Sequence, residues 1–329
     1  MKNALKFLFF LIILGCSNDE TNPETETETE TETVSVLTLT NSSIVSNTPF
    51  SKPREAIVFD NNLYTINDMN TYKYDFSSNM WETINTNSTG VANYPYFEYN
   101  VSFIRDNKWN IINQNALWTF DFTTNNWEKI KEFSDNFLTS PIGVYHNDSL
   151  FIFSDIFDKV YKYNFENNTL VEHSTFEQKN NYGQLVKSIF KIGDTYYFTK
   201  LSDYNKISIY KWIDNFTTFE FLNEYQSEYI AQGSGFVFND NIVFGLGGET
   251  SSDGNDNITS FQLNKEFYYY NTTNNSFKKI ENNFYEGRYV SLPFEHNNKF
   301  YLIGGQTINN NEIIYKATLD QLEFKFIEN

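Results

Sequence analysis

Two pairs of arginine and glutamate are the residues of this 329-residue chain best suited to bind a charged ligand. Arg54 is followed by Glu55, and Glu286 stands two positions before Arg288. The chain has 42 acidic against 24 basic side chains and a formal net charge of -18, so its cations are scarce. Two guanidinium groups in such a protein can hold a carboxylate in bidentate fashion. Alternatively, each arginine forms a structural salt bridge with the glutamate beside it, and the sequence leaves both interpretations open.

Aromatic residues in long connecting segments form a second set of candidates. They include Tyr94, Tyr96, Tyr182 and Tyr285. An aromatic face with amide neighbours can stack on a sugar or hold a peptide. A chain with 19% aromatic residues also places some of them in loops by composition alone, so both interpretations stay open.

The remaining residues offer little for catalysis, metals or nucleic acid. A single cysteine excludes a disulfide scaffold and a cysteine-ligated zinc or iron-sulfur site, and the acidic excess argues against nucleic-acid binding. The sequence from Asp253 to Asn257 resembles an oxygen-rich calcium loop but lacks the distal glutamate of that motif. No nucleophile, base and orienting group stand at an informative spacing. We therefore predict no catalytic residue, no metal and no cofactor, and enzymatic activity is left open but disfavoured.

The first fifteen residues have the pattern of a secretory signal. Two lysines precede an apolar run from Phe7 to Leu14, which is too short to span a bilayer as a mature helix, and Gly15 comes before Cys16. A small residue followed by cysteine resembles the lipobox of bacterial lipoproteins. This resemblance implies a signal peptide over 1–15 and lipidation of Cys16, with the membrane as a partner through acyl chains. The alternative is an uncleaved anchor with a chance cysteine.

An acidic spacer follows the cysteine. Residues 17–33 contain seven carboxylates, no cation and no large apolar side chain, so nothing compensates the entropy of ordering them. A spacer of this length reaches at most roughly 60 Å. Asp19 and Glu20 directly after the cysteine resemble the surface-export signal of some Gram-negative lipoproteins. We therefore expect residues 16–33 to be a lipidated spacer at the outer membrane, exposed at the cell surface, with a periplasmic orientation as the alternative.

The folded part, residues 34–329, is a repeated unit that must position the candidate residues. Six segments share an aromatic or small residue followed seven positions later by a large apolar one, and the second members lie 43 to 58 residues apart. Such a period is typical of a repeat array. The pairs are Tyr74 with Trp81, Phe120 with Trp127, Tyr163 with Leu170, Trp212 with Phe219, Tyr270 with Phe277, and Ala317 with Phe324.

Turn-forming residues divide each unit into four short strands. Turn-forming triplets that end on asparagine, such as SerSerAsn at 77–79 and ThrThrAsn at 123–125, lie between the members of most pairs. A second turn such as AspAsnAsn at 60–62 lies upstream. Six four-stranded antiparallel sheets of about 49 residues without helical periodicity predict an all-β fold, a six-bladed β-propeller. A stacked sandwich would not require such regular spacing.

The same residues resemble the kelch family. Its repeat has Arg or Pro before the first strand, a diglycine after the second, and an aromatic-Asp step followed by Trp. Here ProArg stands at 53–54, GlyArg at 287–288, GlyGly at 247–248 and 304–305, and TyrAsp at 74–75 precedes Trp81. In the other four units Asn67, Asn113, Ser154 and Thr199 stand near the diglycine position. The resemblance implies a kelch-type propeller over residues 50–327.

The two ends of the chain compete to close the ring. Residues 34–40 alternate like a strand, and a terminal strand often completes the last sheet of a propeller. The last unit already has a predicted fourth strand at residues 322–326. The sequence therefore does not decide which terminus closes the ring.

The lengths of the connections point to one end of the propeller. The first and third connections of each unit are tight, whereas the second connections and the crossovers include long segments. These are residues 85–93, 131–140, 172–181, 223–232, 281–286 and, longest, 249–262. Long loops on a rigid scaffold commonly carry recognition. Arg54 and Arg288 occupy equivalent positions in the first and sixth units, so ring closure is expected to bring them together near one mouth of the channel.

Three functions follow from these observations. The leading hypothesis is a lipid-anchored, non-enzymatic protein that binds a glycan or a protein through the long-loop end. The kelch resemblance implies an alternative, a carbohydrate enzyme similar to sialic-acid mutarotases, with Arg54, Glu55, Glu286 and Arg288 around an anionic sugar. A copper oxidase of that family needs a cysteine in the propeller, and Cys16 lies outside it. A third hypothesis is a structural subunit of an outer-membrane assembly.

Overall fold

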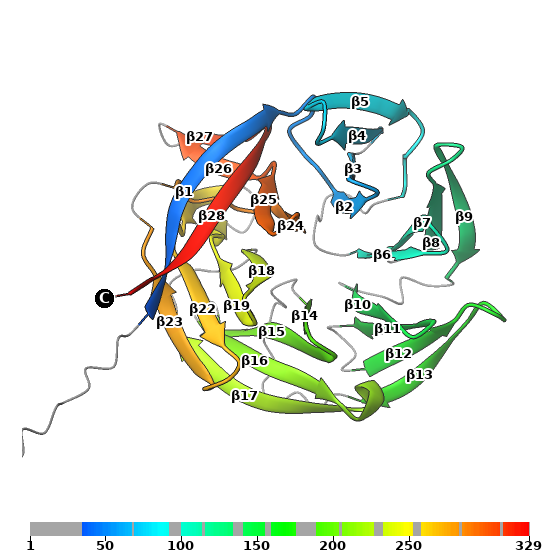
Figure 1. The fold of residues 1–329 in the computed structure, drawn as a ribbon. Helices are drawn as coiled ribbons and strands as arrows, with labels where there is room; N and C mark the ends of the chain where they lie inside the picture. Colours follow the sequence, from blue (N-terminus) through cyan, green and yellow to red (C-terminus); the bar gives the residue numbers. More distant parts are fainter. Residues whose placement is uncertain are drawn as a thin grey trace, which may run out of the picture.

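The repeated units form six blades arranged around a central axis (Figure 1). The computed structural model describes residues 35–67, 69–91, 100–113, 116–133, 141–154, 159–175, 189–203, 206–226, 233–252, 258–282, 285–309 and 312–328. Each blade is a four-stranded antiparallel sheet, which confirms the predicted all-β, six-bladed propeller. Within these ranges no helix has the length and apolar character needed to cross a membrane.

The first strand of every blade lies next to the axis and the fourth lies at the rim (Figure 1). A 3-10 turn, Asp214–Phe216, and two extra hairpins accompany the blades. The strands of the six blades are, in order from axis to rim, β2 Glu55–Phe59, β3 Asn62–Ile66, β4 Thr71–Asp75 and β5 Met80–Asn85; β6 Val101–Arg105, β7 Lys108–Ile112, β8 Ala116–Asp121 and β9 Asn126–Glu132; β10 Pro141–His146, β11 Ser149–Ser154, β12 Lys159–Asn164 and β13 Thr169–Thr175; β14 Ile189–Ile192, β15 Thr195–Asp203, β16 Lys206–Ile213 and β17 Thr218–Gln226; β18 Ser234–Phe238, β19 Asn241–Gly245, β22 Phe267–Asn271 and β23 Ser276–Ile280; β24 Leu292–His296, β25 Lys299–Ile303, β28 Thr318–Glu328 and β1 Ser35–Asn47.

Asparagine and aspartate close the tight turns because their short polar side chains tolerate a left-handed backbone. In the first turn of blade 1, Asp60 has φ 46° and Asn61 has φ 57°, and four other first turns also place two successive residues at positive φ. Two-residue hairpins of this twist require positive φ at both central positions. The predicted hairpins of the repeat are therefore confirmed.

The aromatic residue of each pair anchors the third turn. The Tyr74 hydroxyl donates a hydrogen bond to Asn79 Oδ1 at 2.9 Å, and Asn79 has φ 55°. The Ser77 amide donates to Asp75 Oδ1 at 2.7 Å, which holds the pKa of the Asp75 carboxyl below its ordinary value. The same tyrosine to asparagine bond recurs in blades 3 and 5, at Tyr163 with Asn168 and Tyr270 with Asn275. This local chemistry explains why the motif repeats.

The described residues form six core clusters of apolar side chains, each lying between two neighbouring blades. Between blades 1 and 2, for example, Tyr64 and Ile66 of β3 pack with Trp109 and Phe120 of blade 2. Trp127 packs against this cluster, and its indole nitrogen donates to Thr71 Oγ1 at 2.8 Å across the seam. Many of the aromatic residues therefore join neighbouring blades.

The N-terminal strand closes the ring. β1 pairs along its length with β28, so the sixth blade joins the two ends of the chain. Leu37 and Leu39 of β1 are 0% and 2% exposed in the cluster between blades 5 and 6. β1 also bulges against its neighbour near Ile44, as the rim strands of blades 1 to 4 do. The rim strand of the last blade is thus supplied from the other end of the sequence.

This closure corrects two predictions. The segment at residues 322–326 belongs to β28, which is the third strand of the last blade rather than the fourth. Ala317 and Phe324 therefore do not form the sixth pair, because Ala317 directly precedes β28 and Phe324 lies within it, so no turn separates them. A period read along the chain cannot reveal a strand contributed from 270 or more positions away, as in the pairing of Asn47 with Thr318.

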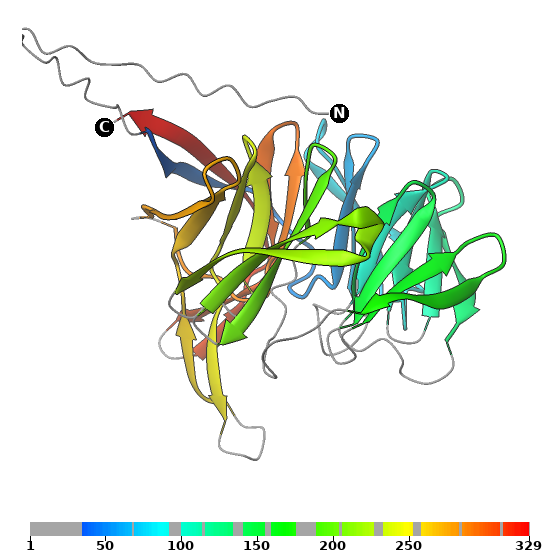
Figure 2. The ribbon, with the colours of Figure 1, turned by 90° about the horizontal axis from the view of Figure 1, so that it is seen from below.

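The propeller has two different ends. The tight-turn end carries the first and third connections, and the crossover end carries the second connections and the segments between blades. The hairpin of β20 (Gly248–Ser252) and β21 (Ile258–Leu263) projects beyond the ring at the crossover end (yellow in Figure 2). A second hairpin, of β26 (Gln306–Asn309) and β27 (Glu312–Tyr315), interrupts blade 6 at the same end.

The glycines after the second strands are offset from the predicted register. In blade 6 the two positive-φ residues are Gly304 (φ 66°) and Gly305 (φ 97°), whereas in blade 5 they are Leu246 (φ 60°) and Gly247 (φ 85°). Relative to the end of the second strand, the diglycine at 247–248 therefore begins one position later than the diglycine at 304–305. A Cβ atom on Gly304 would lie 2.5 Å from Pro53 Cδ, so glycine is needed there for the close approach of blades 6 and 1.

Candidate functional site

The crossover end is built up by the two extra hairpins. The prediction that first and third connections are tight and the others long is confirmed in outline, and the longest predicted loop, 249–262, is mostly the β20–β21 hairpin. The β26–β27 hairpin was not predicted. Its sequence signal is three asparagines at 309–311 between apolar residues on both sides. Residues 253–257, which resemble a calcium loop, lie outside the described ranges.

The predicted charged residues do not form an open clamp. Arg54 and Arg288 are only 1% and 2% exposed, and Glu55 is 7% exposed. The Arg54 amide donates to the Ile66 carbonyl at 2.7 Å, and the preceding Pro53 packs against Gly304, so the structure does bring this segment to the seam between blades 6 and 1. The arginines are buried because blade packing covers the segments that precede the first strands.

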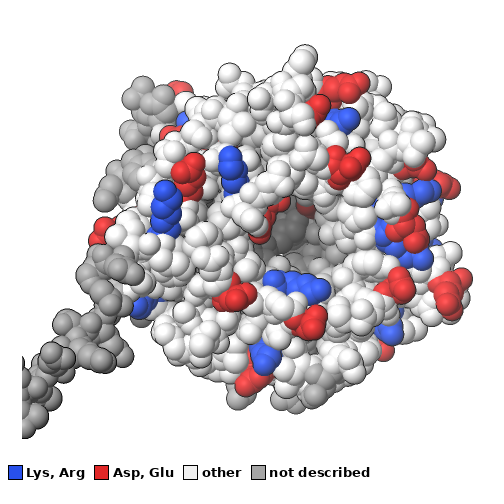
Figure 3. Space-filling view, viewed as in Figure 1, with Lys and Arg blue, Asp and Glu red and all other residues white. Residues whose placement is uncertain are grey.

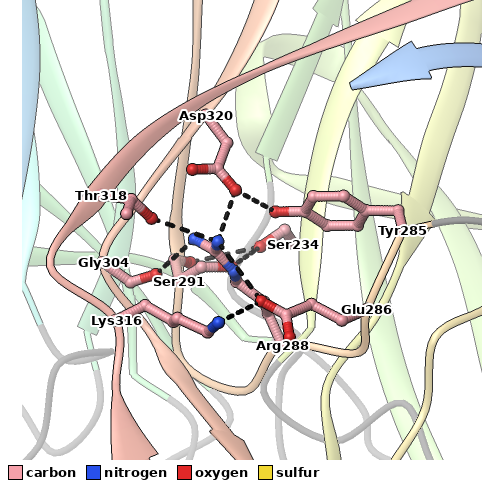
Figure 4. Close-up of polar contacts among 9 residues, drawn as sticks. All are labelled: Ser234, Tyr285, Glu286, Arg288, Ser291, Gly304, Lys316, Thr318 and Asp320. Atoms are coloured by element: carbon pink, nitrogen blue, oxygen red, sulfur yellow. Dashed lines mark hydrogen bonds and ion pairs between the residues drawn. The ribbon is translucent and has the colours of Figure 1, made fainter. Parts of the chain in front are cut away.

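The guanidinium of Arg288 lies in a buried polar network (Figure 4). Its terminal nitrogens donate to the Gly304 carbonyl at 2.9 Å and to Thr318 Oγ1 at 3.2 Å, and they form an ion pair with Asp320 Oδ2. The structural salt bridge foreseen as an alternative is therefore present at Arg288. Its main partner is Asp320, which the sequence analysis did not identify, and the Glu286 carboxylate is farther away at 3.9 Å.

Tyr285 belongs to this network rather than to an exposed loop. Its side chain is 6% exposed and packs in the cluster between blades 5 and 6. The hydroxyl donates to Asp320 Oδ2 at 3.0 Å, and burial raises the pKa of Tyr285 well above its ordinary value. The prediction of a ligand-facing Tyr285 is therefore wrong. The other three predicted tyrosines, Tyr94, Tyr96 and Tyr182, and the predicted lipidation residue Cys16 lie outside the described residues.

Asp320 stands at a position that is aromatic in the other five blades. It pairs with Leu302 of the second strand, and the residues paired at the equivalent place are Tyr72, Trp118, Tyr161, Tyr210 and Tyr268. A buried carboxylate and guanidinium carry a desolvation cost that a well-packed aromatic ring does not. The signal in the sequence was an aspartate between Leu319 and Gln321, where the repeat otherwise has an aromatic residue.

Glu286 and Lys316 cover the network on the solvent side. The Lys316 ammonium lies 2.5 Å from Glu286 Oε1, and the two side chains are 28% and 47% exposed. The Glu286 carboxylate lies between Lys316 and the buried guanidinium of Arg288 (Figure 4). Lys316 directly follows β27, and Glu286 lies in the crossover segment between blades 5 and 6. This ion pair therefore joins the base of the β26–β27 hairpin to that segment.

A separate cavity of about 330 Å³ occupies the central channel. The first strands of all six blades line it, with mostly apolar side chains together with Glu55, Asn100 and Ser102. The space-filling view shows a hollow at the middle of the ring with both acidic and basic side chains at its rim (Figure 3). Glu55 therefore lines the channel cavity, whereas Arg288 does not.

The described residues provide two polar places, the channel and the covered network. No group of three or more His, Cys, Asp or Glu side chains within the described ranges is arranged to hold a metal ion. The network can hold a carboxylate through Lys316 and Arg288, and the channel can hold a small polar molecule on Glu55 and Asn100. Neither place shows a nucleophile hydrogen-bonded to a base among the described side chains.

Comparison with known proteins shows the fold. No family model matches the chain, and no curated protein matches it. Of the 744 matching chains in solved structures, that of YjhT superposes with a TM-score of 0.61 and 12% sequence identity, over 83% of this chain and 100% of YjhT. At this identity the likeness supports the six-bladed propeller alone, because one fold hosts many functions. Membership of the kelch family stays a prediction.

Proposed function

We propose that this protein is a lipid-anchored binding protein that recognises a glycan or a protein through the crossover end of its propeller. The observation that carries the proposal is the pair of hairpins, β20–β21 (Figure 2) and β26–β27 (Figure 1), inserted at this end in neighbouring blades. Among the described residues, the connections at the opposite end are all tight turns. Extensions that collect at one end of a rigid scaffold are typical of a recognition surface.

The sequence of the first 33 residues supports the anchoring part of the proposal. A short apolar run, Gly15 and Cys16 resemble a lipobox, and the acidic spacer that follows separates the propeller from the lipid. We expect an outer-membrane location, with the propeller at the cell surface or on the periplasmic face. Labelling with a palmitate analogue tests this part, since Cys16→Ser should abolish incorporation and retention in the membrane fraction.

A glycan array and a pulldown with the chain from residue 34 onward test the binding part. β1 must be retained because it completes the sixth blade. A variant with residues 250–260 replaced by AsnGly should lose the ligand, and Lys299→Ala on the tight-turn end should keep it. If nothing is captured in either assay, or if the shortened variant captures as much as the wild type, recognition through the crossover end is refuted. A co-purifying membrane complex would instead indicate an assembly subunit.

The central cavity favours one alternative function, a carbohydrate enzyme similar to the sialic-acid mutarotases. Its support is the channel, with the buried carboxylate of Glu55 and the amide of Asn100 on its wall. The buried arginines count against a clamp formed by both. NMR measurement of anomer exchange of sialic acid, with wild type against Glu55→Gln, decides this point. No acceleration by the wild-type protein would eliminate the enzyme.

A further inference from the structure

We propose that Lys316 and Arg288 form a binding site for the carboxylate of an acidic glycan, and that Glu286 occupies this site in the absence of ligand. The inference rests on the proposed function, since it names the chemistry that the crossover end recognises. The Glu286 carboxylate has both cations beside it, with Lys316 Nζ at 2.5 Å and the Arg288 guanidinium at 3.9 Å. A carboxylate of a ligand placed there meets the same two groups.

The charges of Arg288, Lys316, Asp320 and Glu286 show which of the two carboxylates a ligand can replace. Arg288 and Asp320 form a buried ion pair, with side chains 2% and 4% exposed, and Tyr285 donates a second hydrogen bond to Asp320. Asp320 is thus held in place and compensates the guanidinium. Lys316 and Glu286 are the remaining cation and anion, and both are partly exposed. Exposed ion pairs contribute little to stability, so Glu286 can leave at low cost.

The buried half of the site is maintained against the pattern of the fold. The five other blades place an aromatic ring where Asp320 stands. Among the described residues, Arg288 Nε and Asp320 Oδ1 are buried without a hydrogen-bond partner. Buried polar groups that packing alone does not require are concentrated at functional sites. The pair keeps a guanidinium fixed directly beneath the Glu286 carboxylate.

The surroundings favour a sugar acid over a peptide. Tyr315, next to Lys316 in the sequence, is 38% exposed and presents a flat ring at the crossover end, and the Lys52 ammonium lies 4.2 Å from the centre of that ring. No described carboxylate is within ion-pair distance of Lys52. A peptide strand would need an open edge. On the β26 side of the hairpin, next to the Arg288 segment, the edge is already bridged to Tyr289 at Gln306.

Calorimetric titration with a trimer of galacturonic acid tests the proposal, with the neutral galactose trimer and a triglutamate peptide as comparison ligands. Glu286→Gln should tighten binding of the acidic trimer by about threefold, since it removes a competing carboxylate. Lys316→Met should weaken binding by about tenfold, which corresponds to the loss of one charge-assisted hydrogen bond. The double variant should bind no more tightly than Lys316→Met. The affinity should also fall with added salt.

Lys279→Met is the matched control. Lys279 also lies at the crossover end, in blade 5, and its ammonium forms an ion pair with the Glu266 carboxylate at 3.2 Å. This variant should bind the acidic trimer as the wild type does. Equal binding by wild type, Glu286→Gln and Lys316→Met would overturn the proposal, as would preference for the neutral trimer or for triglutamate. If the crossover end binds a neutral glycan independently of Lys316, only the anion site fails. If no ligand binds at all, the proposed function fails with it.

Discussion

The contact between blades 6 and 1 gives a sharp test of how the ring closes. Gly304 and Gly193 both have a left-handed backbone, with φ 66° and 57°. They differ in the space around them. A Cβ atom on Gly304 would lie 2.5 Å from Pro53 Cδ and 2.6 Å from Pro53 Cγ, whereas a Cβ atom on Gly193 would have no other heavy atom within 4 Å. Substitution by alanine therefore separates backbone strain from steric overlap.

The expected magnitudes follow from these two terms. The left-handed conformation costs an alanine about 1–2 kcal/mol, and the stiffer unfolded chain returns about half of that, so Gly193→Ala should destabilise by about 1 kcal/mol. Gly304→Ala carries the same term plus overpacking of about 1–3 kcal/mol, because the Pro53 ring is part of the backbone and cannot rotate away. The difference between the two variants should be about 1–3 kcal/mol.

Urea unfolding followed by circular dichroism measures this difference. Scanning calorimetry should show a melting temperature lower for Gly304→Ala than for Gly193→Ala by about 2–6 °C. Pro53→Ala in the Gly304→Ala background should recover part of the loss, since it removes the atoms that the new Cβ meets. Equal destabilisation by the two glycine substitutions would refute the close approach of the two blades at this point.

Three further predictions concern the seams and the network. Leu39→Ala should lower the free energy of unfolding by about 3 kcal/mol, because it leaves a cavity in the cluster between β1 and blade 5. Ile44→Ala, on the same strand but 64% exposed, should change the free energy of unfolding by less than about 0.5 kcal/mol. Equal changes for the two variants in urea unfolding would contradict closure of the ring by β1. Asp320→Asn should cost about 3–5 kcal/mol because it removes the buried counter-charge of the Arg288 guanidinium and leaves only the more distant, partly exposed Glu286. A combined Arg288→Met and Asp320→Leu variant should cost less, and a double variant with a lower melting temperature than the single one would argue against the ion pair. Burial raises the pKa of Tyr270 to about 12 from 10.0, so the unfolded chain loses this proton at lower pH than the folded one. The contribution of Tyr270 to stability should be full below pH 10 and decline from pH 10 to 12, and the decline in stability should be less steep in Tyr270→Phe. An unchanged slope in pH-dependent urea titrations of this variant would count against the assignment.

The local parts of the fold were predictable because they depend on neighbours in the chain. Asp60 and Asn61 close their turn through their own backbone preferences, and Tyr74 reaches Asn79 only five positions away. Repetition of these turns at a period near 49 residues indicates the number of blades. Aromatic residues at alternating strand positions likewise had to pack between sheets.

The candidate site depended on contacts that no local pattern contains. Arg288 and Tyr285 meet Asp320 more than 30 positions away, and this contact turns two residues that looked accessible into buried ones. The sequence alone determined the repeat, the turns, the blade number and the acidic character of the chain, since these rest on residue types and short spacings. The tertiary structure alone decided that β1 closes the ring and that Glu286 rather than an open arginine pair faces solvent, because burial depends on which distant segments pack together.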